Sequence, residues 1–451
     1  MNACAIVMAA GKGSRMQSKY HKGTHKICGK EMVNIIIDKL KACGINEINV
    51  VVGEHKESVM EVTKDKNVSY SFQEEQLGTG HAILCAEDFL KNKSGDVLIF
   101  ACDMPLFEKE NIFKLMNTHK NENNSSTIVT SFLDDALSYG RVVRKDGNII
   151  CIKECKDCNE TELLINEINT SIYCFKVRDL ISSVKQIKNL NSQNEFYLTD
   201  VIEILVNESK KVGSISVAND EVIGVDSRIQ LHKVNEVLRE KINDYHMKNG
   251  VSILCSKSTY IDLDVEIGKD VVIHPNVYIC GKSVLEDDCE ILPNTRIVNS
   301  VVCSGVRIES SSIYDSKVGK NSFIGPCAYL RPNSVIGENV KIGDFVEIKN
   351  SFIGDNTKVS HLSYVGDAIV GKNCNLGCGI VTVNYNGKEK NKTIIEDNCF
   401  VGCNVNLIAP VLVEKDSYVA AGTTITEKVE SKSLAIGRCK QVNKKDWVLR
   451  K

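Results

Sequence analysis

A glycine-rich loop with two cations follows the first apolar run of the chain. Residues 3–8 are apolar, and residues 9–16 read AAGKGSRM. Glycines at this point allow the backbone to approach phosphate oxygens, while Lys12 and Arg15 supply positive charge. The loop lacks the Gly-Lys-Ser/Thr ending of a Walker motif. Taken alone, it fits either a phosphate site or a simple chain reversal.

A second group of residues whose side chains could take part in catalysis or binding lies in the C-terminal half. It comprises Arg331, Glu347, Lys349, His361, Tyr364, Asn375, Asn384 and Tyr385. An isolated histidine is more often structural, which is the interpretation for His274. His361 differs because cations, amides and a tyrosine accompany it, and an imidazole titrates near neutral pH. This group predicts a site that uses a general base.

Short apolar runs alternate with helical patterns over about the first hundred residues. The apolar runs are 3–8, 48–52 and 97–100, and a helical spacing lies between the first two. This rhythm predicts an α/β domain, Rossmann-like, with a mainly parallel sheet. Ligands bind at the carboxyl ends of such strands, so the loops after Met8 and Phe100 are the expected site.

One amphipathic helix separates this region from the rest. Its apolar residues fall at three- and four-residue steps, and Asn249-Gly250 ends it. The apolar positions are Leu231, Val234, Leu238, Ile242 and Tyr245. We expect a linker helix at 228–250, between an N-terminal domain at 1–227 and a C-terminal domain at 251–451.

Beyond the helix, aliphatic residues recur every six positions. The uninterrupted series is Val318, Ile324, Leu330, Ile336, Ile342 and Ile348, several of them followed by glycine. This period predicts a left-handed parallel β-helix, a prism with one short strand per face in each coil. The series slips after Ile348 and again after Val365, and the polar group lies around these slips.

The net charge, the length of the apolar runs and the cysteine content limit the classes of protein that the sequence fits. Among 451 residues the formal net charge is −2, so the overall balance suggests no nucleic-acid partner. No run approaches the length needed to cross a bilayer, and we expect a soluble, cytoplasmic protein. The 19 scattered cysteines fit a reducing compartment. Cys151, Cys155 and Cys158 raise a zinc alternative that lacks a fourth ligand.

Several further motifs make the N-terminal region resemble the sugar-1-phosphate nucleotidyltransferases. They are Gln73 with QLGTGHA at 76–82, DMPL at 103–106, YGR at 139–141, NT at 169–170 and EFYLTD at 195–200. With the β-helix behind them, nearly the whole chain resembles the bifunctional N-acetylglucosamine-1-phosphate uridylyltransferase/glucosamine-1-phosphate N-acetyltransferase family.

For the first site, the resemblance implies nucleotidyl transfer assisted by Mg²⁺. Asp103 and Asp226 would bind the metal through hard oxygen donors, and the alternative is two surface aspartates. Lys12, Arg15 and Lys22 would stabilise the departing pyrophosphate, with Arg15 and Lys22 counted as catalytic. Gln73, Gly78 and Thr79 would contact the uracil, and Gly140, Glu154 and Asn169 the sugar. The other implied substrate contacts are Met8, Ala9, Ala10, Gly11 and Ala101.

The sequence departs from the family pattern around this site. Residues 18–25 lack the usual Leu-Pro-Lys, so Lys19 or Lys26 are alternatives to Lys22. Ala101-Cys102 stands where Tyr-Gly is usual, Asp226 where asparagine is usual, and Ser171 where glycine is usual. The reaction type is unaffected, whereas the preference for base and sugar stays open.

For the second site, the resemblance implies acetyl transfer from acetyl-CoA. His361 would be the general base and Glu347 its orienting partner, while Arg331, Lys349, Tyr364 and Asn375 would bind the sugar phosphate. The implied acetyl-CoA contacts are Cys378, Asn384, Tyr385, Cys403, Ala421 and Arg438, with Lys390 and Lys392 near its phosphates. A covalent acetyl-cysteine route through Cys403 is the alternative.

The family therefore implies a cytoplasmic homotrimer without nucleic-acid or membrane partners. It implies an enzyme that makes UDP-N-acetylglucosamine from glucosamine-1-phosphate, acetyl-CoA and UTP. N-acetylglucosamine-1-phosphate would be the intermediate. UDP-N-acetylglucosamine feeds peptidoglycan, teichoic acid or lipopolysaccharide synthesis. One alternative is a monofunctional nucleotidyltransferase with a β-helix that only assembles the oligomer. Another is a β-helical binding scaffold with a decayed first domain.

Overall fold

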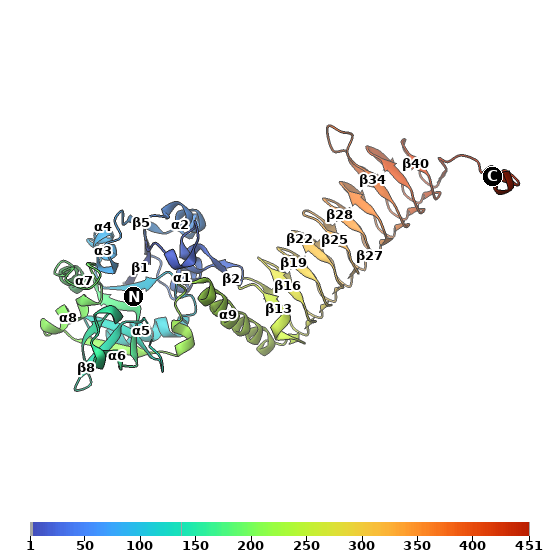
Figure 1. Cartoon of the computed structure of the whole chain (residues 1–451). Helices are drawn as coiled ribbons and strands as arrows, with labels where there is room; N and C mark the ends of the chain where they lie inside the picture. Colours follow the sequence, from blue (N-terminus) through green and yellow to red (C-terminus); the bar gives the residue numbers. More distant parts are fainter. Residues whose placement is uncertain (1–2, 137, 451) are drawn as a thin grey trace. The chain divides into compact units, whose positions relative to one another are not determined.

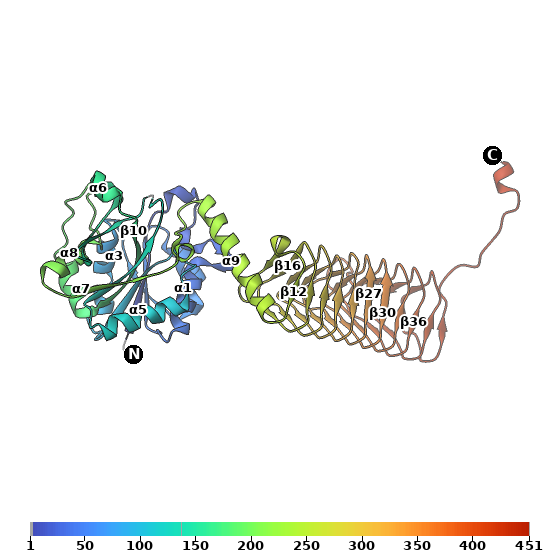
Figure 2. The ribbon, with the colours of Figure 1, turned by 90° about the horizontal axis from the view of Figure 1, so that it is seen from below.

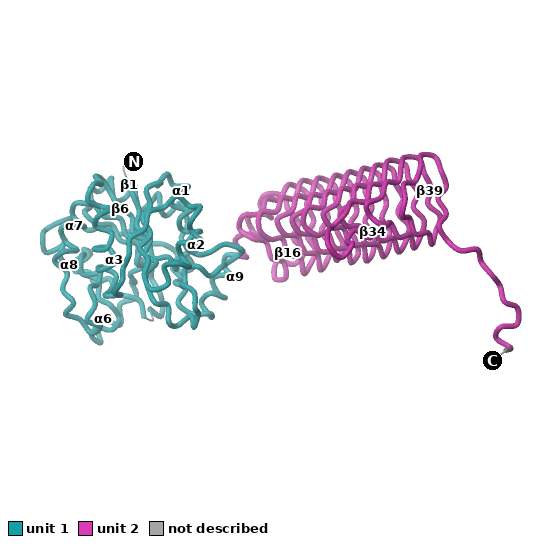
Figure 3. The backbone as a smooth tube through the Cα atoms, turned by 90° about the horizontal axis from the view of Figure 1, so that it is seen from above, with its two compact units in different colours: residues 1–238 teal, residues 239–451 magenta. Residues whose placement is uncertain are grey.

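The chain folds into two compact units, Met1–Leu238 and Arg239–Lys451 (Figure 3). The computed structural model describes residues 3–136 and 138–450, so residues 1, 2 and 451 of the expected domain ranges lie outside it. Among the helices of the described residues, none is long and apolar enough to span a membrane. None of the nineteen cysteines, all of which lie in the described residues, forms a disulfide.

Unit 1 is built on one mixed sheet with the strand order β11-β7-β10-β6-β1-β4-β5 (Figure 1). The strands are β1 (Ala3–Ala9), β4 (Ile48–Val52), β5 (Ser69–Phe72), β6 (Asp96–Ala101), β7 (Ser126–Phe132), β8 (Arg141–Lys145), β9 (Asn148–Lys153), β10 (Glu167–Lys176) and β11 (Val212–Ser216). The predicted parallel pairing holds from β6 through β1 and β4 to β5, and between β11 and β7. β10 runs antiparallel to both β6 and β7.

Helices cover both faces of this sheet, and the strand alternation supplies a core on each side. Along β1, Ala5, Val7 and Ala9 pack into a core with α1 and α5, whereas Cys4 and Ile6 pack into a core with α3, α7 and α8. The helices are α1 (Met32–Ala42), α2 (Lys56–Thr63), α3 (Thr79–Cys85), α4 (Glu87–Leu90), α5 (Lys109–Asn121), α6 (Glu160–Leu163), α7 (Val177–Val184) and α8 (Asp200–Asn207).

A long helix, α9 (Arg228–Lys248), begins in unit 1 and ends in unit 2, with the division between the two units after Leu238. Val234 is fully buried, while Leu238 and Ile242 are nearly so. Tyr245, at the end of the predicted apolar series, is instead 62% exposed. In unit 2, the side chain of Asn243 donates to the carbonyl oxygen of Thr259, at the start of the β-helix.

Unit 2 is a prism of short parallel strands that form three faces (Figure 2). Face 1 begins at β12 (Ser252–Ile253) and includes β27 (Lys341–Asp344), β30 (Lys358–His361), β33 (Asn375–Leu376), β36 (Phe400–Val401) and β39 (Tyr418–Val419). Face 2 includes β22 (Ser312–Tyr314), β25 (Tyr329–Leu330), β28 (Glu347–Lys349), β31 (Tyr364–Gly366) and β34 (Val381–Val383). Face 3 includes β26 (Val335–Ile336), β29 (Phe352–Ile353), β32 (Ala368–Val370), β35 (Thr393–Ile395) and β38 (Val411–Val413).

The six-residue series predicted from the sequence fills the interior of this prism. Val318, Ile324, Leu330, Ile342 and Ile348 are all fully buried. The slips fall at the corner between face 2 and face 3, where Ile348 on β28 is followed by Ile353 on β29 after five positions instead of six. Val365 on β31 and Val370 on β32 repeat this spacing. The slips are therefore tighter corners.

Candidate functional sites

The first candidate site lies at the carboxyl ends of β1 and β6, as expected for parallel strands. Met8 and Ala101 are register partners there, and the backbone N–H of Cys102 donates to the carbonyl oxygen of Met8 at 3.1 Å. Ala9 and Ala10 are buried, whereas Gly11 and Lys12 are exposed. The glycine-rich loop is therefore open to solvent directly beyond the strand.

Four predicted charged residues meet beside this loop. The Lys22 ammonium contacts the Asp103 carboxylate and lies 2.8 Å from Oδ1 of Asp226, and Arg15 lies 3.0 Å from Oδ2 of Asp226. Burial alone would raise the pKa of Asp226, but Lys22 and Arg15 hold that pKa below its ordinary value. Burial opposes the charge on Lys22, yet Asp103 and then Asp226 raise its pKa above the ordinary value.

The two carboxylates therefore share one cation, and the backbone fixes them as a pair. The N–H of Val225 donates to the carbonyl oxygen of Asp103 at 3.0 Å. Because one ammonium reaches both carboxylates, their oxygens converge on a point where positive charge is held. Such a pair fits Mg²⁺, which binds one or two protein carboxylates together with water and phosphate oxygens. Within the described residues, no group of three or more histidines, cysteines, aspartates or glutamates could hold a metal, Cys151, Cys155 and Cys158 included.

Among the three lysines that the altered loop offers, only Lys22 reaches the carboxylates. Lys19 is exposed and lies over the ring of Tyr20, and Lys26 pairs with Glu31 at 3.4 Å. Lys22 begins a short helical turn, and His21 fixes this turn because its Nδ1 accepts the N–H of Gly23 at 3.0 Å. His21 is 1% exposed.

The residues expected at the uracil form a connected polar group beside α3. The side-chain amide of Gln73, itself buried, donates to the carbonyl oxygen of Gly78 at 2.9 Å. The hydroxyl of Thr79 accepts the N–H of Leu198 at 2.9 Å. Gly78 has a φ of 111°, and a Cβ there would lie 2.5 Å from the carbonyl oxygen of Phe196. Only glycine tolerates both this positive φ and the close approach of the Phe196 carbonyl oxygen.

The residues expected at the sugar also meet. The N–H of Asn169 donates to the carbonyl oxygen of Gly140, and a Cβ on Gly140 would lie 3.5 Å from Oε2 of Glu154. Burial raises the pKa of Glu154, although the Thr199 hydroxyl donates to its Oε1 at 3.0 Å. The structure thus brings a half-buried carboxylate, a buried amide and a glycine to one place.

The second candidate site contains a histidine–carboxylate pair, and here the structure corrects the expected partner. Nδ1 of His361 lies 2.6 Å from Oδ1 of Asp344, because β27 and β30 place these residues opposite each other. The hydrogen bond from His361 lowers the pKa of Asp344. Glu347, the expected orienting residue, instead pairs with Arg331 at 2.9 Å. Asp344 therefore fixes the His361 ring and leaves Nε2 available to accept a proton.

Three of the residues expected at acetyl-CoA, Cys378, Cys403 and Ala421, continue from His361 in one column along the prism. Backbone hydrogen bonds join successive coils from Leu362 N to Asp344 O, from Gly379 N to His361 O, from Asn404 N to Cys378 O and from Gly422 N to Cys403 O. Ala421 occupies the next position of the same column, and the Arg438 guanidinium contacts its carbonyl oxygen. Cys403 is exposed and Cys378 half-buried. One long ligand could therefore follow this corner.

Lys349, Tyr364 and Asn384 form a separate network around Asp367, a residue that the sequence analysis did not select. Lys349 Nζ lies 3.2 Å from Oδ2 of Asp367, and Asn384 Nδ2 contacts the same oxygen and lies 3.3 Å from the Tyr364 hydroxyl. Tyr385 is 57% exposed in the loop after Asn384. Asn375 lies on face 1, at register with Lys358, so one chain divides the expected sugar-phosphate residues between two faces.

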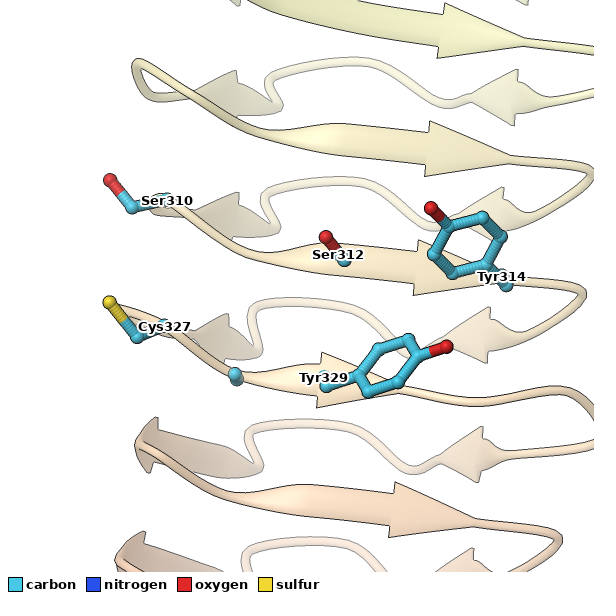
Figure 4. A pocket seen from close by; sticks show the side chains of 6 residues that line it. Ser310, Ser312, Tyr314, Cys327 and Tyr329 are labelled. Atoms are coloured by element: carbon cyan, nitrogen blue, oxygen red, sulfur yellow. The ribbon is translucent and has the colours of Figure 1, made fainter.

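A shallow hollow of about 330 Å³ lies on face 2, earlier in the prism (Figure 4). It is lined by Ser310, Ser312, Tyr314, Cys327, Ala328 and Tyr329, none of which belongs to either predicted site. The Tyr314 and Tyr329 rings meet edge to face at 5.8 Å. The hollow offers hydroxyls, a thiol and aromatic surface but no charged group, so it does not match the phosphate binding expected at the two sites.

The comparison with known proteins covers the whole chain. Residues 5–160 match the MobA-like NTP transferase domain, residues 264–299 the bacterial transferase hexapeptide (six repeats), and residues 315–434 the GMPPB C-terminal domain. The bifunctional protein GlmU of Clostridium kluyveri is 51% identical over 452 residues, covering 100% of this chain and 99% of the relative. That of Clostridium botulinum is 52% identical with the same coverage.

The chain belongs to the GlmU family of bifunctional proteins. The family predicted from the sequence motifs is thus confirmed, and so are both folds, the α/β nucleotidyltransferase domain and the left-handed parallel β-helix. The residue roles within the GlmU fold remain predictions, with Asp344 in place of Glu347 beside His361.

The buried His21 predicts a pH dependence for the stability of unit 1. Burial and, to a smaller extent, the neighbouring Lys22 together lower the pKa of His21 to about 4. Between its ordinary pKa of about 6.5 and this value, the unfolded chain binds a proton that the folded unit does not. Stability should therefore fall as the pH drops, by about 2 kcal/mol at pH 5.

Calorimetry of the full chain between pH 7 and 5 measures this effect. His21→Gln keeps an acceptor for the N–H of Gly23 but does not titrate, so its unit 1 transition should lose less stability on acidification than that of the unsubstituted chain. His274→Gln, in unit 2, is the control. Equal acid sensitivity in all three proteins would contradict the assignment.

Proposed function

We propose that this enzyme makes UDP-N-acetylglucosamine in two steps. Unit 2 transfers an acetyl group from acetyl-CoA to the amine of glucosamine-1-phosphate, and unit 1 then joins the product to UTP with release of pyrophosphate. The observation that carries the proposal is the presence of two separate polar sites in a chain that matches bifunctional relatives over its full length. We assign uridylyl transfer to residues 1–227, a linker helix to 228–250 and acetyl transfer to 251–451.

Membership in a bifunctional family confirms the predicted pair of transferase activities and disfavours the monofunctional alternative. A β-helix that only assembles an oligomer has no use for the paired His361 and Asp344 or for the network around Asp367. The β-helix in this proposal is a second catalytic domain.

In the uridylyl step, the residues of unit 1 align and neutralise anions. Lys12, Arg15 and Lys22 surround the loop where the triphosphate would lie, and they balance the charge that develops on the departing pyrophosphate. Asp103 and Asp226 would hold Mg²⁺, which supplies Lewis-acid stabilisation of phosphate oxygens when bound. Gln73, Gly78 and Thr79 would hold the uracil, and Gly140, Glu154 and Asn169 the sugar.

In the acetyl step, His361 acts as the general base. Its Nε2 accepts a proton from the attacking amine, while Asp344 holds the Nδ1–H and stabilises the imidazolium that forms. The nitrogen–carbon bond forms as the carbon–sulfur bond of the thioester breaks, and the imidazolium gives its proton to the departing thiolate, so that coenzyme A leaves as the thiol. Arg331 and Lys349, with Tyr364 and Asn375, would bind the sugar phosphate, and the column from Cys378 to Ala421, with Asn384, Tyr385 and Arg438, would bind acetyl-CoA.

Single substitutions should separate the two activities. His361→Ala should abolish acetylation of glucosamine-1-phosphate and leave pyrophosphate release from UTP and N-acetylglucosamine-1-phosphate within about twofold, because the two sites lie in different units. Asp103→Ala should do the reverse. Both products are followed in one preparation with Mg²⁺ present. Loss of both activities from either change in a folded protein would refute the two-site assignment.

The corrected partner of His361 gives a sharper expectation. Asp344→Asn removes the carboxylate that fixes the ring, so kcat for acetylation should fall on the order of 10- to 100-fold with little change in KM. Glu347→Gln is the matched control, since Glu347 pairs with Arg331 and should affect mainly the KM for the sugar phosphate. If Glu347→Gln lowers kcat more than Asp344→Asn does, Glu347 is the orienting residue after all.

We also propose that the β-helix assembles as a homotrimer. Face 3 presents a ladder of outward apolar side chains, in which Val335, Phe352, Ile369 and Ile394 are register partners on successive coils. Each is 36–42% exposed. A continuous apolar strip of this kind favours contact with a second copy. The division of Asn375 and Lys349 between two faces also fits a site completed where copies meet.

A charge on this ladder should break the assembly. Phe352→Asp should give a monomer with less acetylation and unchanged uridylyl transfer, because an uncompensated carboxylate would be buried between copies. Light scattering gives the mass. Leu190→Asp is the control for oligomeric state, since Leu190 is 85% exposed and lies in unit 1, outside the β-helix. A stable monomer of the unsubstituted chain with full acetyltransferase activity would contradict the trimer.

A further inference from the structure

A buried carboxylate, Asp367, lies at the corner between β31 and β32. It is 7% exposed. This corner is one of the two slips singled out from the sequence, where the interior series shortens after Val365. A buried carboxylate is costly unless hydrogen bonds satisfy both of its oxygens.

Both oxygens of Asp367 are satisfied, by residues from the coil before it and the coil after it. Oδ1 accepts from Asn350 Nδ2 at 2.6 Å, and Oδ2 accepts from Lys349 Nζ at 3.2 Å and from Asn384 Nδ2. Burial would raise the pKa of Asp367, but Asn350, Asn384 and Lys349 hold it below its ordinary value. Asp367 is therefore an anion that fastens one ammonium and two amides.

The same corner elsewhere in the prism does not require this arrangement. Asp315 occupies the equivalent corner after β22, where Ile313 and Val318 show the same five-residue spacing. Its backbone N–H donates to Val298 at 3.0 Å, as that of Asp367 donates to Lys349 at 2.9 Å. Asp315 is exposed, however, and its Oδ1 accepts from Asn299 at 3.3 Å. Corner geometry thus explains an aspartate here but not the contacts to Lys349 and Asn384.

The geometry points to Asp367 as a positioning residue that couples the two substrates of acetyl transfer, an inference that rests on the proposed function. One carboxylate oxygen holds Lys349, assigned to the sugar phosphate, and Asn384, assigned to acetyl-CoA. It therefore sets the distance between the groups that bind the two substrates. Asn384 extends this network to the Tyr364 hydroxyl at 3.3 Å. Gly366 leaves room for that hydroxyl, since a Cβ there would lie 2.4 Å from it.

The test compares Asp367→Asn with the matched control Asp315→Asn in the full chain. An asparagine keeps the shape but removes the charge and one acceptor, so Lys349 and Asn384 lose their common anchor. The KM values for glucosamine-1-phosphate and for acetyl-CoA should both rise about tenfold, the effect of losing a charge-assisted hydrogen bond. Asp315→Asn should leave both within about twofold. Uridylyl transfer by unit 1 should be unchanged in both variants.

If Asp367→Asn fails to fold, a double-substitution cycle measures the coupling between Lys349 and Asn384 instead. Lys349→Met and Asn384→Ala are made singly and together, and kcat/KM for acetylation is measured. Coupling through Asp367 predicts that the double substitution costs at least about threefold less than the product of the two single effects. Strict additivity, or unchanged KM values in a folded Asp367→Asn protein, would overturn the inference. Absence of acetylation by the unsubstituted chain would instead overturn the proposed function.

Discussion

Register between stacked coils is the constraint on which the second site depends. Each strand of the prism pairs in parallel with the strand one coil later, so residues about one coil apart in the sequence come to lie one above the other. Asp344 and His361 meet for this reason, and so do Asn350 and Asp367. The site is therefore held by the backbone ladder, which positions side chains more rigidly than loops do.

This register also explains what the sequence could predict. The interior series was readable because a buried aliphatic residue every six positions has no other explanation in a water-soluble fold. The sequence analysis expected Glu347 beside His361, whereas the structure places Asp344 there and pairs Glu347 with Arg331. The slip between Ile348 and Ile353 shortens the coil, and His361 and Asp344 are 17 positions apart. Counting one shortened coil back from His361 would have identified Asp344.

In unit 1 the limits of sequence reasoning are different. The rule that ligands bind at the carboxyl ends of parallel strands was enough to select the loop after Met8 and the region of Asp103. The choice among Lys19, Lys22 and Lys26 was open, because all three lie in an altered loop and a side chain's direction there depends on tertiary contacts. The turn that His21 fixes directs Lys22 alone to Asp103 and Asp226. No local pattern encodes that contact.

Both candidate sites hold cations on carboxylates of the same chain. Lys22 lies on Asp103 and Asp226, Arg331 on Glu347, and Lys349 on Asp367. A long cationic side chain that is already ordered loses less conformational entropy when a phosphate arrives. The disadvantage is that the phosphate must either share the cation with the carboxylate or displace the carboxylate from it.

In unit 2, the exposure of each carboxylate decides whether a phosphate would displace it from its cation or share the cation with it. The Glu347 side chain is 37% exposed, so its pair with Arg331 is screened by water and contributes at most about 1 kcal/mol. A phosphate can replace it at small cost. The Asp367 side chain is 9% exposed, and removing it from its donors would leave a buried charge unpaired. In the proposed acetyl transfer, Arg331 is thus the cation that would be released to the sugar phosphate, while Lys349 would bind it without leaving Asp367.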